Sequence, residues 1–335
     1  MINRLVVAAA AGLALAAPAF AQTSMPFALD WQFEGPAAPY FMAIENGHFE
    51  AEGLSVEITA GQGSLDAIPK VATGAYPVGF ADMASLIKFL DQNPEAPVTA
   101  VMMFYDKPAF SVVGRKSLGI EEPKDLEGRV LGAPPPDGAW AQFPVFAAEN
   151  GIDMTQVTVE PVGFPTREPM LAEGQVAAVT GFSFTSFLNT LRLGVPEEDI
   201  TVLLMADHGL DLYGNAIIAN TDFARENPEK VTGFLRAIAR GLQDTINDPE
   251  AGVAAMVSRN PAMDQALELR RLELALRDNI VTDWVRENGL GGIDEARFAS
   301  SLEQLAMTYE FRNEPDPARY FDGSYLPDDG SLMIE

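Results

Sequence analysis

Residues 54–81 read LSVEITAGQGSLDAIPKVATGAYPVGFA, and this stretch predicts a strand, a turn, a helix and a second strand in succession. Apolar and polar residues alternate over 54–58, as they do in a half-buried strand. The turn at 61–64 leads into a helix expected over 65–73, and the apolar run at 78–81 is the next strand. Strands that alternate with helices of this length indicate parallel pairing, with helices covering both faces of the sheet.

The same alternation continues on both sides of this unit. Further strands are expected at 27–31, 98–104, 130–133, 157–159 and 177–180, and two segments that look like returning strands at 201–205 and 212–219. Helices are expected at 39–46, from Asp82 to about residue 91, from the 134–138 turn to 150, and at 166–173 and 183–192. After a turn-rich break at 119–128 and the second block, the chain closes with apolar residues at helical spacing over 222–227, 228–247, 249–260, 264–279 and 293–308.

This order of elements predicts an α/β protein of two lobes joined by a hinge, with the second lobe inserted in the first. We expect the first lobe to hold residues 22–114 and 208–335 and the second lobe to hold residues 115–207, with the chain crossing near 112–118 and 205–212. Ligands of open α/β sheets bind beyond the carboxyl ends of the strands. Two such edges facing each other form a cleft, which hinge bending closes over a small ligand.

The first 21 residues, MINRLVVAAAAGLALAAPAFA, have the order of a secretory signal. A positive charge at Arg4 precedes an apolar run from Leu5 to Ala17, and a small-x-small site ends at Ala21. This order predicts a signal peptide cleaved near Ala21 and an exported, periplasmic protein. The alternative is an N-terminal membrane anchor, but the apolar run is short for a span, which needs about 20 apolar residues.

The composition excludes several classes of function. The chain of 335 residues has no cysteine, so disulfides, thiolate catalysis and iron–sulfur clusters are excluded. Its formal net charge is −26 at pH 7, so nucleic acid and anionic lipid surfaces are repelled. There are only two histidines, His48 and His208, so chemistry that needs several histidines is excluded. We therefore expect no cofactor, no bound metal and no nucleic-acid partner.

The loops that follow the strands supply the candidate ligand contacts. Aromatic side chains there would stack on a flat ligand, while carboxylates and serine would bind its N–H and O–H groups. The candidates are Trp31, Phe33, Gln62, Ser64, Asp82, Asp137, Trp140, Arg167, Phe182 and Asp211. Because acidic residues outnumber basic ones in these loops, a neutral or weakly basic ring compound fits better than a strong anion. Replacing Trp140 with alanine is expected to weaken binding more than about tenfold.

Two enzymatic alternatives are open to the same residues. Ser64 or Ser183 could form a triad with His208 and Asp211, although the chain has no G-x-S-x-G elbow. Asp207, His208 and Asp211 could instead hold a metal ion, although a lone histidine is usually structural. Neither pattern is specific, so the sequence favours a binding protein without catalytic residues.

Several motifs resemble one known family. The opening Leu29-Asp30-Trp31 and the run AIENGHFEAEGLSVEI at 43–58 match its first strand and A-x-x-x-G-x-F-x-x-x-G-L-x-V pattern. Further matches are the GQGS turn at 61–64, ATG at 72–74 with VGFAD at 78–82, PKDLEG at 123–128 and LAEGQVAAV at 171–179. On these motifs the chain resembles the periplasmic substrate-binding proteins of ABC importers, in the branch of nitrate, sulfonate, taurine and thiamine-pyrimidine-precursor binders. Two positions depart from that branch: Ala37 replaces a histidine and Ala177 an aspartate.

The resemblance implies a two-lobed, type II-like periplasmic-binding-protein fold and a monomeric solute receptor without catalysis. Its partners would be a small-molecule ligand and an ABC permease with its ATPase, so it would meet the membrane only through the permease. We expect the ligand to be a ring-containing or heterocyclic compound, and the alternative ligand is a sulfonate, taurine-like or carboxylate anion. Two other classes stay open: a pyrimidine-processing or hydrolytic enzyme on the same fold, and a receptor domain that signals to a membrane sensor.

Overall fold

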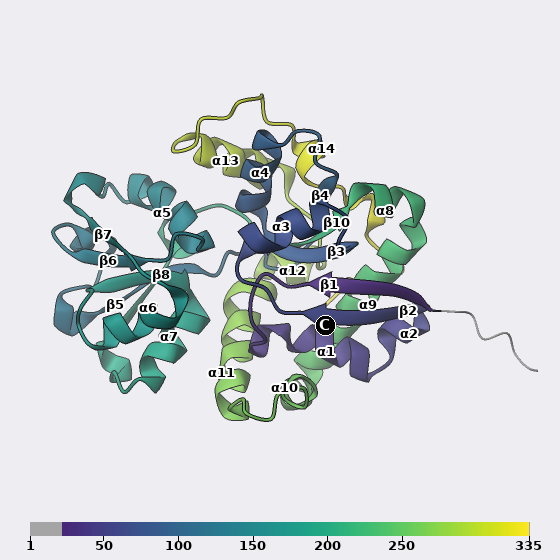
Figure 1. The fold of residues 1–335 in the computed structure, drawn as a ribbon, viewed down its shortest axis with the longest axis horizontal. Helices are drawn as coiled ribbons and strands as arrows, with labels where there is room; N and C mark the ends of the chain where they lie inside the picture. Colours follow the sequence, from purple (N-terminus) through teal and green to yellow (C-terminus); the bar gives the residue numbers. More distant parts are fainter. Residues whose placement is uncertain (1–21, 335) are drawn as a thin grey trace, which may run out of the picture.

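The computed structural model describes residues 22–334, which form two α/β lobes side by side (Figure 1). The predicted signal peptide at 1–21 lies outside the described residues. Each lobe is built on one five-stranded sheet. The first sheet has the order β2 (Leu54–Thr59), β1 (Thr23–Ala28), β3 (Val78–Asp82), β10 (Asn215–Asn220), β4 (Val98–Met103). The second has the order β7 (Thr158–Pro161), β6 (Val130–Ala133), β8 (Ala178–Phe182), β5 (Phe110–Arg115), β9 (Ile200–Leu204).

The two sheets repeat the same pairing. β1 runs parallel to β2 and β3, and β6 runs parallel to β7 and β8. β10 is antiparallel to β3 and β4, and β5 is antiparallel to β8 and β9. β5 and β10 are the strands with which the chain enters the second lobe and returns to the first, so the predicted α/β architecture with an inserted second lobe is confirmed.

Helices cover the sheets of both lobes (Figure 1). The second lobe carries α5 (Gly138–Glu149), α6 (Phe164–Ala172) and α7 (Ser183–Arg192). The first lobe carries α1 (Ala38–Glu45), α2 (His48–Ala51), α3 (Ser64–Ala72), α4 (Met83–Gln92), α8 (Thr221–Glu226), α9 (Pro228–Asn247), α10 (Pro249–Val257), α11 (Gln265–Ala275), α12 (Asp283–Asn288), α13 (Glu295–Ala306) and α14 (Pro317–Tyr320).

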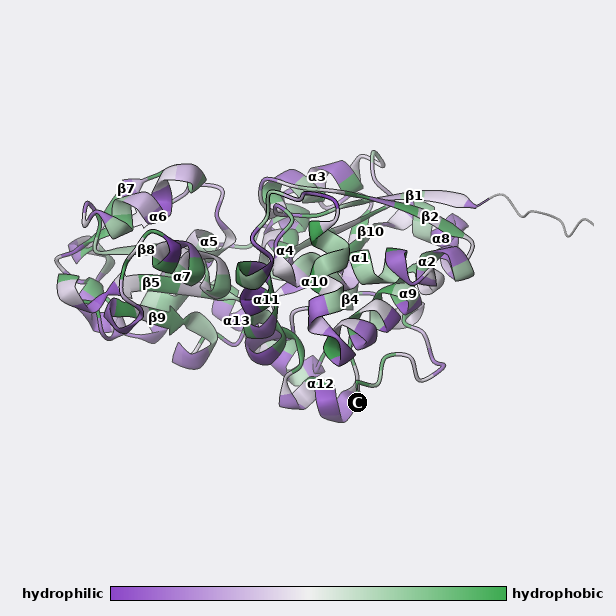
Figure 2. Ribbon diagram, turned by 90° about the horizontal axis from the view of Figure 1, so that it is seen from below, coloured by the Kyte–Doolittle hydropathy of each residue, from purple (hydrophilic) through white to green (hydrophobic). Residues whose placement is uncertain are grey.

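Hydropathy follows burial in these elements. β3 and β4 are buried at every residue, whereas in β2 the apolar residues Leu54, Val56 and Ile58 are buried or half-buried and alternate with exposed polar residues. α1 is mostly apolar in Figure 2 and buries six of its eight residues, while α9 shows a hydrophilic outer face. The core of the first lobe therefore lies between its sheet and the helices that pack on it.

The structure places the first crossing between the lobes earlier than the sequence predicted. Residues 110–115 form β5 within the second sheet, so the chain crosses at 104–109 and not at 112–118. The return crossing, expected at 205–212, runs over 205–214 between β9 and β10. The sequence prediction missed β5 because its six residues, FSVVGR, are too few for a hydrophobic pattern to distinguish a strand from a connection.

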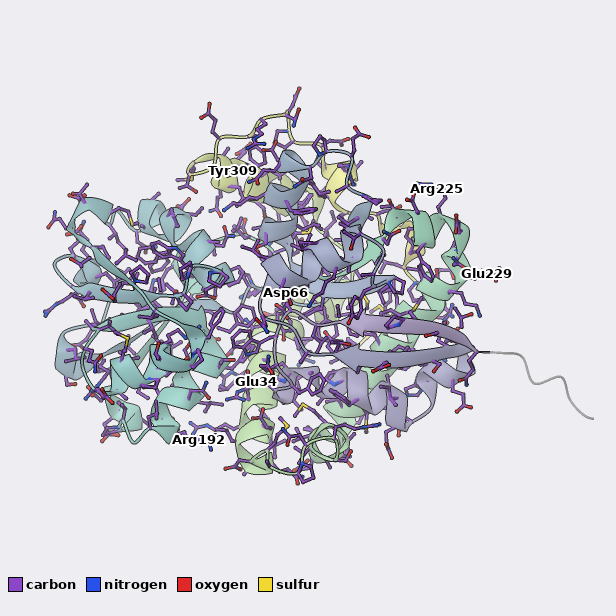
Figure 3. The ribbon with its side chains drawn as sticks, in the orientation of Figure 1. Glu34, Asp66, Arg192, Arg225, Glu229 and Tyr309 are labelled. Atoms are coloured by element: carbon purple, nitrogen blue, oxygen red, sulfur yellow. The ribbon has the colours of Figure 1, made fainter. Side chains whose placement is uncertain are left out.

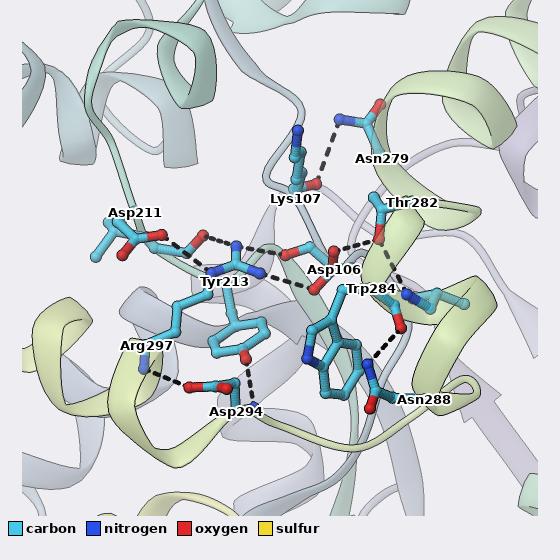
Figure 4. A network of polar contacts seen from close by, with 12 residues as sticks. Asp106, Lys107, Asp211, Tyr213, Asn279, Thr282, Trp284, Asn288, Asp294 and Arg297 are labelled. Carbon is cyan, nitrogen blue, oxygen red and sulfur yellow. Dashed lines mark hydrogen bonds and ion pairs between the residues drawn. The ribbon is translucent and has the colours of Figure 1, made fainter.

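Arg297 of α13 holds the two crossing segments together (Figure 4). Its guanidinium donates to Asp106 Oδ1 at 2.7 Å and to the Asp106 carbonyl at 2.8 Å on the first segment. It also donates to the Leu212 carbonyl at 2.9 Å on the second segment. The same guanidinium lies 4.1 Å from the centre of the Tyr213 ring. One side chain of the first lobe thus contacts both crossing segments of the hinge.

Candidate functional site

A pocket lies between the lobes where the carboxyl ends of strands from both sheets face each other. The empty space within it, including the part that is open to solvent, is about 430 Å³. The first lobe contributes its lining from the ends of β1 and β3 and the start of α3, and the second lobe from β5, β8 and the starts of α5, α6 and α7. The lining residues are Asp30, Trp31, Gly63, Ser64, Asp82, Phe110, Pro136, Asp137, Gly138, Phe164, Arg167, Phe182 and Thr185.

Aromatic rings of the two lobes meet across this pocket. The rings of Trp31 and Phe164 lie edge to face, with centres 4.6 Å apart and an interplanar angle of 70°. Phe182 packs against Phe110 on the second-lobe side, with centres 5.7 Å apart. These rings provide apolar faces against which a flat molecule can stack.

Gly63 brings the backbones of the lobes close together beside the rings. Its φ of +111° is a conformation that side-chain-bearing residues rarely adopt. A Cβ added there would lie 3.3 Å from the Pro136 carbonyl of the second lobe. Glycine at this position therefore permits both the turn into α3 and the close approach of the second lobe.

Three buried carboxyl groups surround the pocket. Asp30 Oδ2 accepts a hydrogen bond of 2.6 Å from Asn215 Nδ2 and one of 3.5 Å from Ser64 Oγ. Burial, opposed by these bonds and supported by the nearby Asp82 charge, raises the pKa of Asp30 to about 7. Burial also raises the pKa of Asp82 to about 6, although its side chain caps α4 through the amide of Ser85.

Asp137 faces these groups from the second lobe. It caps α5 through the amide of Ala139 and accepts a 2.8 Å hydrogen bond from Thr180 Oγ1. Burial raises the pKa of Asp137, and the charge of Arg167 opposes this shift. The pocket therefore has carboxyl groups on both sides, and two of them also fix the start of a helix.

Arg167 is the cation of this pocket, and it is already paired. Its guanidinium lies 2.6 Å and 2.8 Å from Glu168 Oε1, and both side chains are almost fully buried. The same guanidinium lies 5.5 Å from the centre of the Phe164 ring. Because a neighbouring carboxylate offsets its charge, Arg167 adds little net positive potential for an anionic ligand.

A second compartment adjoins the pocket on the side of the first lobe. The two share Asp30, Trp31 and Phe182 in their linings. The other residues around the second compartment are Leu29, Gln32, Glu34, Pro36, Ala37, Tyr40, Phe80, Tyr105 and Phe184. The pocket and this compartment together form one continuous site from the helix starts of the second lobe to α1.

Polar contacts join the lobes at the edge of this site. Figure 3 shows Glu34 between the two lobes, and its Oε2 accepts a 2.6 Å hydrogen bond from Thr185 Oγ1 of α7. Arg271 of α11 donates to Asn189 Oδ1 of α7 at 2.9 Å and pairs with Glu268 at 2.7 Å. The bonds from Thr185 to Glu34 and from Arg271 to Asn189 exist only while the lobes are close, so these two bonds stabilise a closed cleft.

Six of the ten predicted site residues line the pocket. They are Trp31, Ser64, Asp82, Asp137, Arg167 and Phe182. They converge because each follows a strand or begins a helix at the edge where the two sheets face each other.

The structure does not bring the other four predicted residues to either compartment. Trp140 stacks on Phe143, with ring centres 5.7 Å apart, because its position on α5 turns it away from the cleft. Phe33 packs edge to face on Phe41 in the first-lobe core. Gln62 donates its backbone amide to Asp66 beside the pocket turn, and Asp211 lies 3.2 Å from Arg297 in the hinge.

Sequence reasoning missed several residues of the site. Asp30 belongs to a family motif but is not among the predicted contacts, and Phe164 is not among them either. Tyr40 and Tyr105 carried no signal, because one lies within an apolar helix and the other follows a buried strand. Only the position of the cleft in the folded protein distinguishes such residues from ordinary core residues.

The geometry does not support the triad or the metal site. His208 packs against Phe146, with ring centres 6.1 Å apart, and neither histidine lines either compartment. Ser64 Oγ instead accepts the backbone amide of Asp82 at 2.9 Å. Among residues 22–334 no cluster of three histidine, cysteine, aspartate or glutamate side chains is arranged to hold a metal ion. The described helices also include none of the length and apolarity needed to cross a membrane.

Solved structures with the same architecture include ligand-binding components of importers and the desulfurization enzyme DSZB, which has a TM-score of 0.60 and 13% identity over 93% of this chain and 99% of that one. One is the ligand-binding component of an ABC-type import system from Staphylococcus aureus, with a TM-score of 0.68 and 11% identity over 91% of this chain and 98% of that one. Another is the alkanesulfonate-binding protein SsuA of Xanthomonas axonopodis bound to MOPS, with a TM-score of 0.64 and 13% identity over 91% and 98%. The fold is therefore that of the two-lobed solute-binding proteins.

The family model described as "NMT1/THI5 like" matches residues 36–252, and the chain belongs to this family. A similar protein is the riboflavin-binding protein RibY of Chloroflexus aurantiacus, 29% identical over 64% of this chain and 60% of that protein's length. The formylaminopyrimidine-binding protein of Halalkalibacterium halodurans is 27% identical over 69% and 68%. The 4-amino-5-hydroxymethyl-2-methylpyrimidine phosphate synthase of Aspergillus parasiticus is 25% identical over 84% and 87%.

Proposed function

We propose that this protein is a periplasmic receptor that captures a small heterocyclic compound between its lobes and delivers it to an ABC permease. The observation that carries the proposal is the interlobe pocket, in which Trp31 and Phe164 of opposite lobes meet edge to face above buried carboxyl groups. A ligand that contacts both lobes favours the closed state by its extra contacts there. A permease can then distinguish the loaded receptor from the empty one by its shape.

The electrostatics of the pocket favour a ring with N–H donors over an anion. Asp30, Asp82 and Asp137 line it, and its cation Arg167 is paired with Glu168. A sulfonate would have to compete with Glu168 for the guanidinium and approach three carboxyl groups. A neutral or weakly basic heterocycle instead donates to the carboxyl oxygens and stacks on the rings.

The names of the relatives agree with this ligand class. One relative is named for riboflavin and another for formylaminopyrimidine, and both compounds are nitrogen heterocycles. We extend the class of ligand to this chain, because its pocket offers the aromatic faces and hydrogen-bond acceptors that such rings need.

The competing hypothesis is an enzyme, since a relative is named as a synthase. The residues around the pocket include buried carboxyl groups and Ser64, whose hydroxyl is occupied by the Asp82 amide and Asp30. No histidine lies among the lining residues of the two compartments. We therefore expect a compound bound by the purified protein to be released chemically unchanged, and a changed mass after incubation would favour the enzyme.

The periplasmic location rests on the sequence of residues 1–21. We expect the mature protein to begin at Gln22 and to appear in the periplasmic fraction. Edman sequencing of the native protein tests this, and an intact Met1 in a cytoplasmic fraction would contradict it.

The first experiment is native mass spectrometry of the protein purified without denaturation, followed by release of any bound compound. A released heterocycle of a few hundred daltons supports the receptor, because compounds of that size fit pockets of this kind. If the protein is empty, a thermal-shift series with riboflavin, formylaminopyrimidine, MOPS and taurine follows. Stabilisation by the sulfonates alone would overturn the heterocycle proposal.

A further inference from the structure

A buried phenol in the second compartment has no hydrogen-bond partner. Tyr40 of α1 is 1% exposed, and its Oη has no partner among residues 22–334. An unpaired hydroxyl in a protein interior costs free energy, so native proteins nearly always give such groups a partner. A group of the bound ligand would supply the partner that the described residues do not.

Tyr40 lies between the core of the first lobe and the second compartment. The ring is held on the core side by Phe27 and Phe104, each with its centre 5.2 Å away. Tyr40 also lines the second compartment together with Tyr105 and Asp30, and both of these residues are near enough to its phenol to contribute to its raised pKa. Burial raises the pKa of Tyr40 well above its usual value, so the phenol stays protonated and can donate a hydrogen bond.

The two compartments have different linings, so each of them suits a different part of one ligand. The first compartment has rings from both lobes, Trp31, Phe164 and Phe182, and suits the flat ring itself. The second has phenols and carboxylates of the first lobe beside apolar residues, and suits a group with its own hydrogen-bonding atoms. Since the compartments share Asp30, Trp31 and Phe182, one molecule can extend from one into the other.

We propose that the second compartment is a subsite for an extension of the heterocycle that carries a hydrogen-bond acceptor, and that Tyr40 Oη donates a hydrogen bond to that acceptor. This inference rests on the proposed function and specifies its ligand class. The receptor then selects a ring compound with such an extension over the same ring without the acceptor. The selection arises because only the extended compound satisfies the buried phenol.

The test is Tyr40→Phe, which removes the hydroxyl and keeps the ring that packs on Phe27. Because that hydroxyl has no protein partner, we expect the midpoint of thermal unfolding of the ligand-free variant to be unchanged or higher. The matched control is Tyr320→Phe, a tyrosine of α14 that is 5% exposed and lines neither compartment. Isothermal titration measures the affinity of wild type and both variants for riboflavin, for formylaminopyrimidine and for the aminopyrimidine that lacks the formyl group.

The expected result is about a tenfold loss of affinity in Tyr40→Phe for riboflavin, with its hydroxyl-bearing chain, and for formylaminopyrimidine, wherever wild type binds them, with no change for the deformylated amine. Equal affinity of wild type and Tyr40→Phe for all probes would overturn the subsite while leaving the receptor standing. An equal loss for all probes would also overturn it, because Tyr40 would then contact the ring itself. If wild type binds none of these compounds, both the heterocycle receptor and the subsite are wrong.

Discussion

Arg297 Nη1 lies 2.7 Å from Asp106 Oδ1, and this contact joins the last part of the first lobe to the first crossing segment of the hinge. Asp106 is buried and also accepts a hydrogen bond from the hydroxyl of Thr282, while Arg297 donates a hydrogen bond to the carbonyl of Leu212 on the return segment (Figure 4). The two crossing segments are therefore held by one cation. Hinge bending in this protein has to take place around that fixed point.

Replacing Arg297 with alanine should destabilise the protein, because it leaves the buried Asp106 carboxylate without its partner. We expect the free energy of unfolding to fall by about 2 kcal/mol, somewhat less than for a fully buried pair because Arg297 keeps some contact with water. Urea unfolding measures the loss. The control is Arg225→Ala, which breaks an exposed ion pair with Asp222 and should cost less than about 1 kcal/mol. Equal losses in the two variants would argue against the clamp.

The two tryptophans predicted as ligand contacts should differ in their effect on ligand affinity. Trp31→Ala removes the first-lobe ring of the pocket, and we expect affinity for the bound heterocycle to fall more than about tenfold. Trp140→Ala should leave the affinity unchanged, because Trp140 stacks on Phe143 outside both compartments. Titration calorimetry on both variants checks this. A large loss of affinity in Trp140→Ala alone would contradict the structure and support the expectation drawn from the sequence.

The hydrogen bond between Thr185 and Glu34 should favour the closed cleft. Thr185→Val keeps the shape of the side chain and removes the donor, so we expect a larger radius of gyration for the ligand-free protein by small-angle X-ray scattering. Thr190→Val is the matched control on the same helix, because Thr190 Oγ1 is buried without a partner among the described residues. Scattering curves that coincide for wild type and both variants would show that this bond does not hold the lobes.

The raised pKa of Asp30 should give stability a specific dependence on pH. Its carboxyl ionises in the folded protein only near pH 7, and in the unfolded chain near its ordinary value of 3.8. Between these values the folded state holds more protons, so stability falls as the pH rises from about 4 to 7, by up to about 1.4 kcal/mol per pH unit for this group. Below about pH 4 the carboxyl is protonated in both the folded and the unfolded state, so this loss of stability is absent.

Asp30→Asn should therefore flatten this slope and raise stability at pH 8. Urea unfolding from pH 4 to 8 measures the effect, with Asp207→Asn as a control at an exposed carboxylate. A residual slope is expected below about pH 6, because burial also raises the pKa of Asp82. A variant slope that matches the wild-type slope would show that Asp30 is ionised in the folded protein throughout this range.

The sequence by itself determined the two-lobed α/β fold and six of the thirteen residues that line the pocket. Alternating strands and helices with glycine and aspartate at their junctions are local signals, as at Gly63, Asp82 and Asp137. Residues such as Trp31 and Phe182 could be placed in the cleft because the end of a strand fixes the edge of the sheet where its next residues lie.

Only the tertiary structure decided which side of each element faces the ligand. Trp140 and Trp31 both follow turn signals, but the rotation of α5 turns Trp140 onto Phe143 while Trp31 reaches Phe164 of the other lobe. Tyr40 lies in an apolar stretch of sequence typical of a core helix. Its unpaired hydroxyl is recognised only in the folded protein, where α1 packs beside Asp30 and Tyr105. Likewise, Arg297 meets Asp106 across 191 residues of chain, because a hinge contact depends on the packing of distant segments and not on any local pattern.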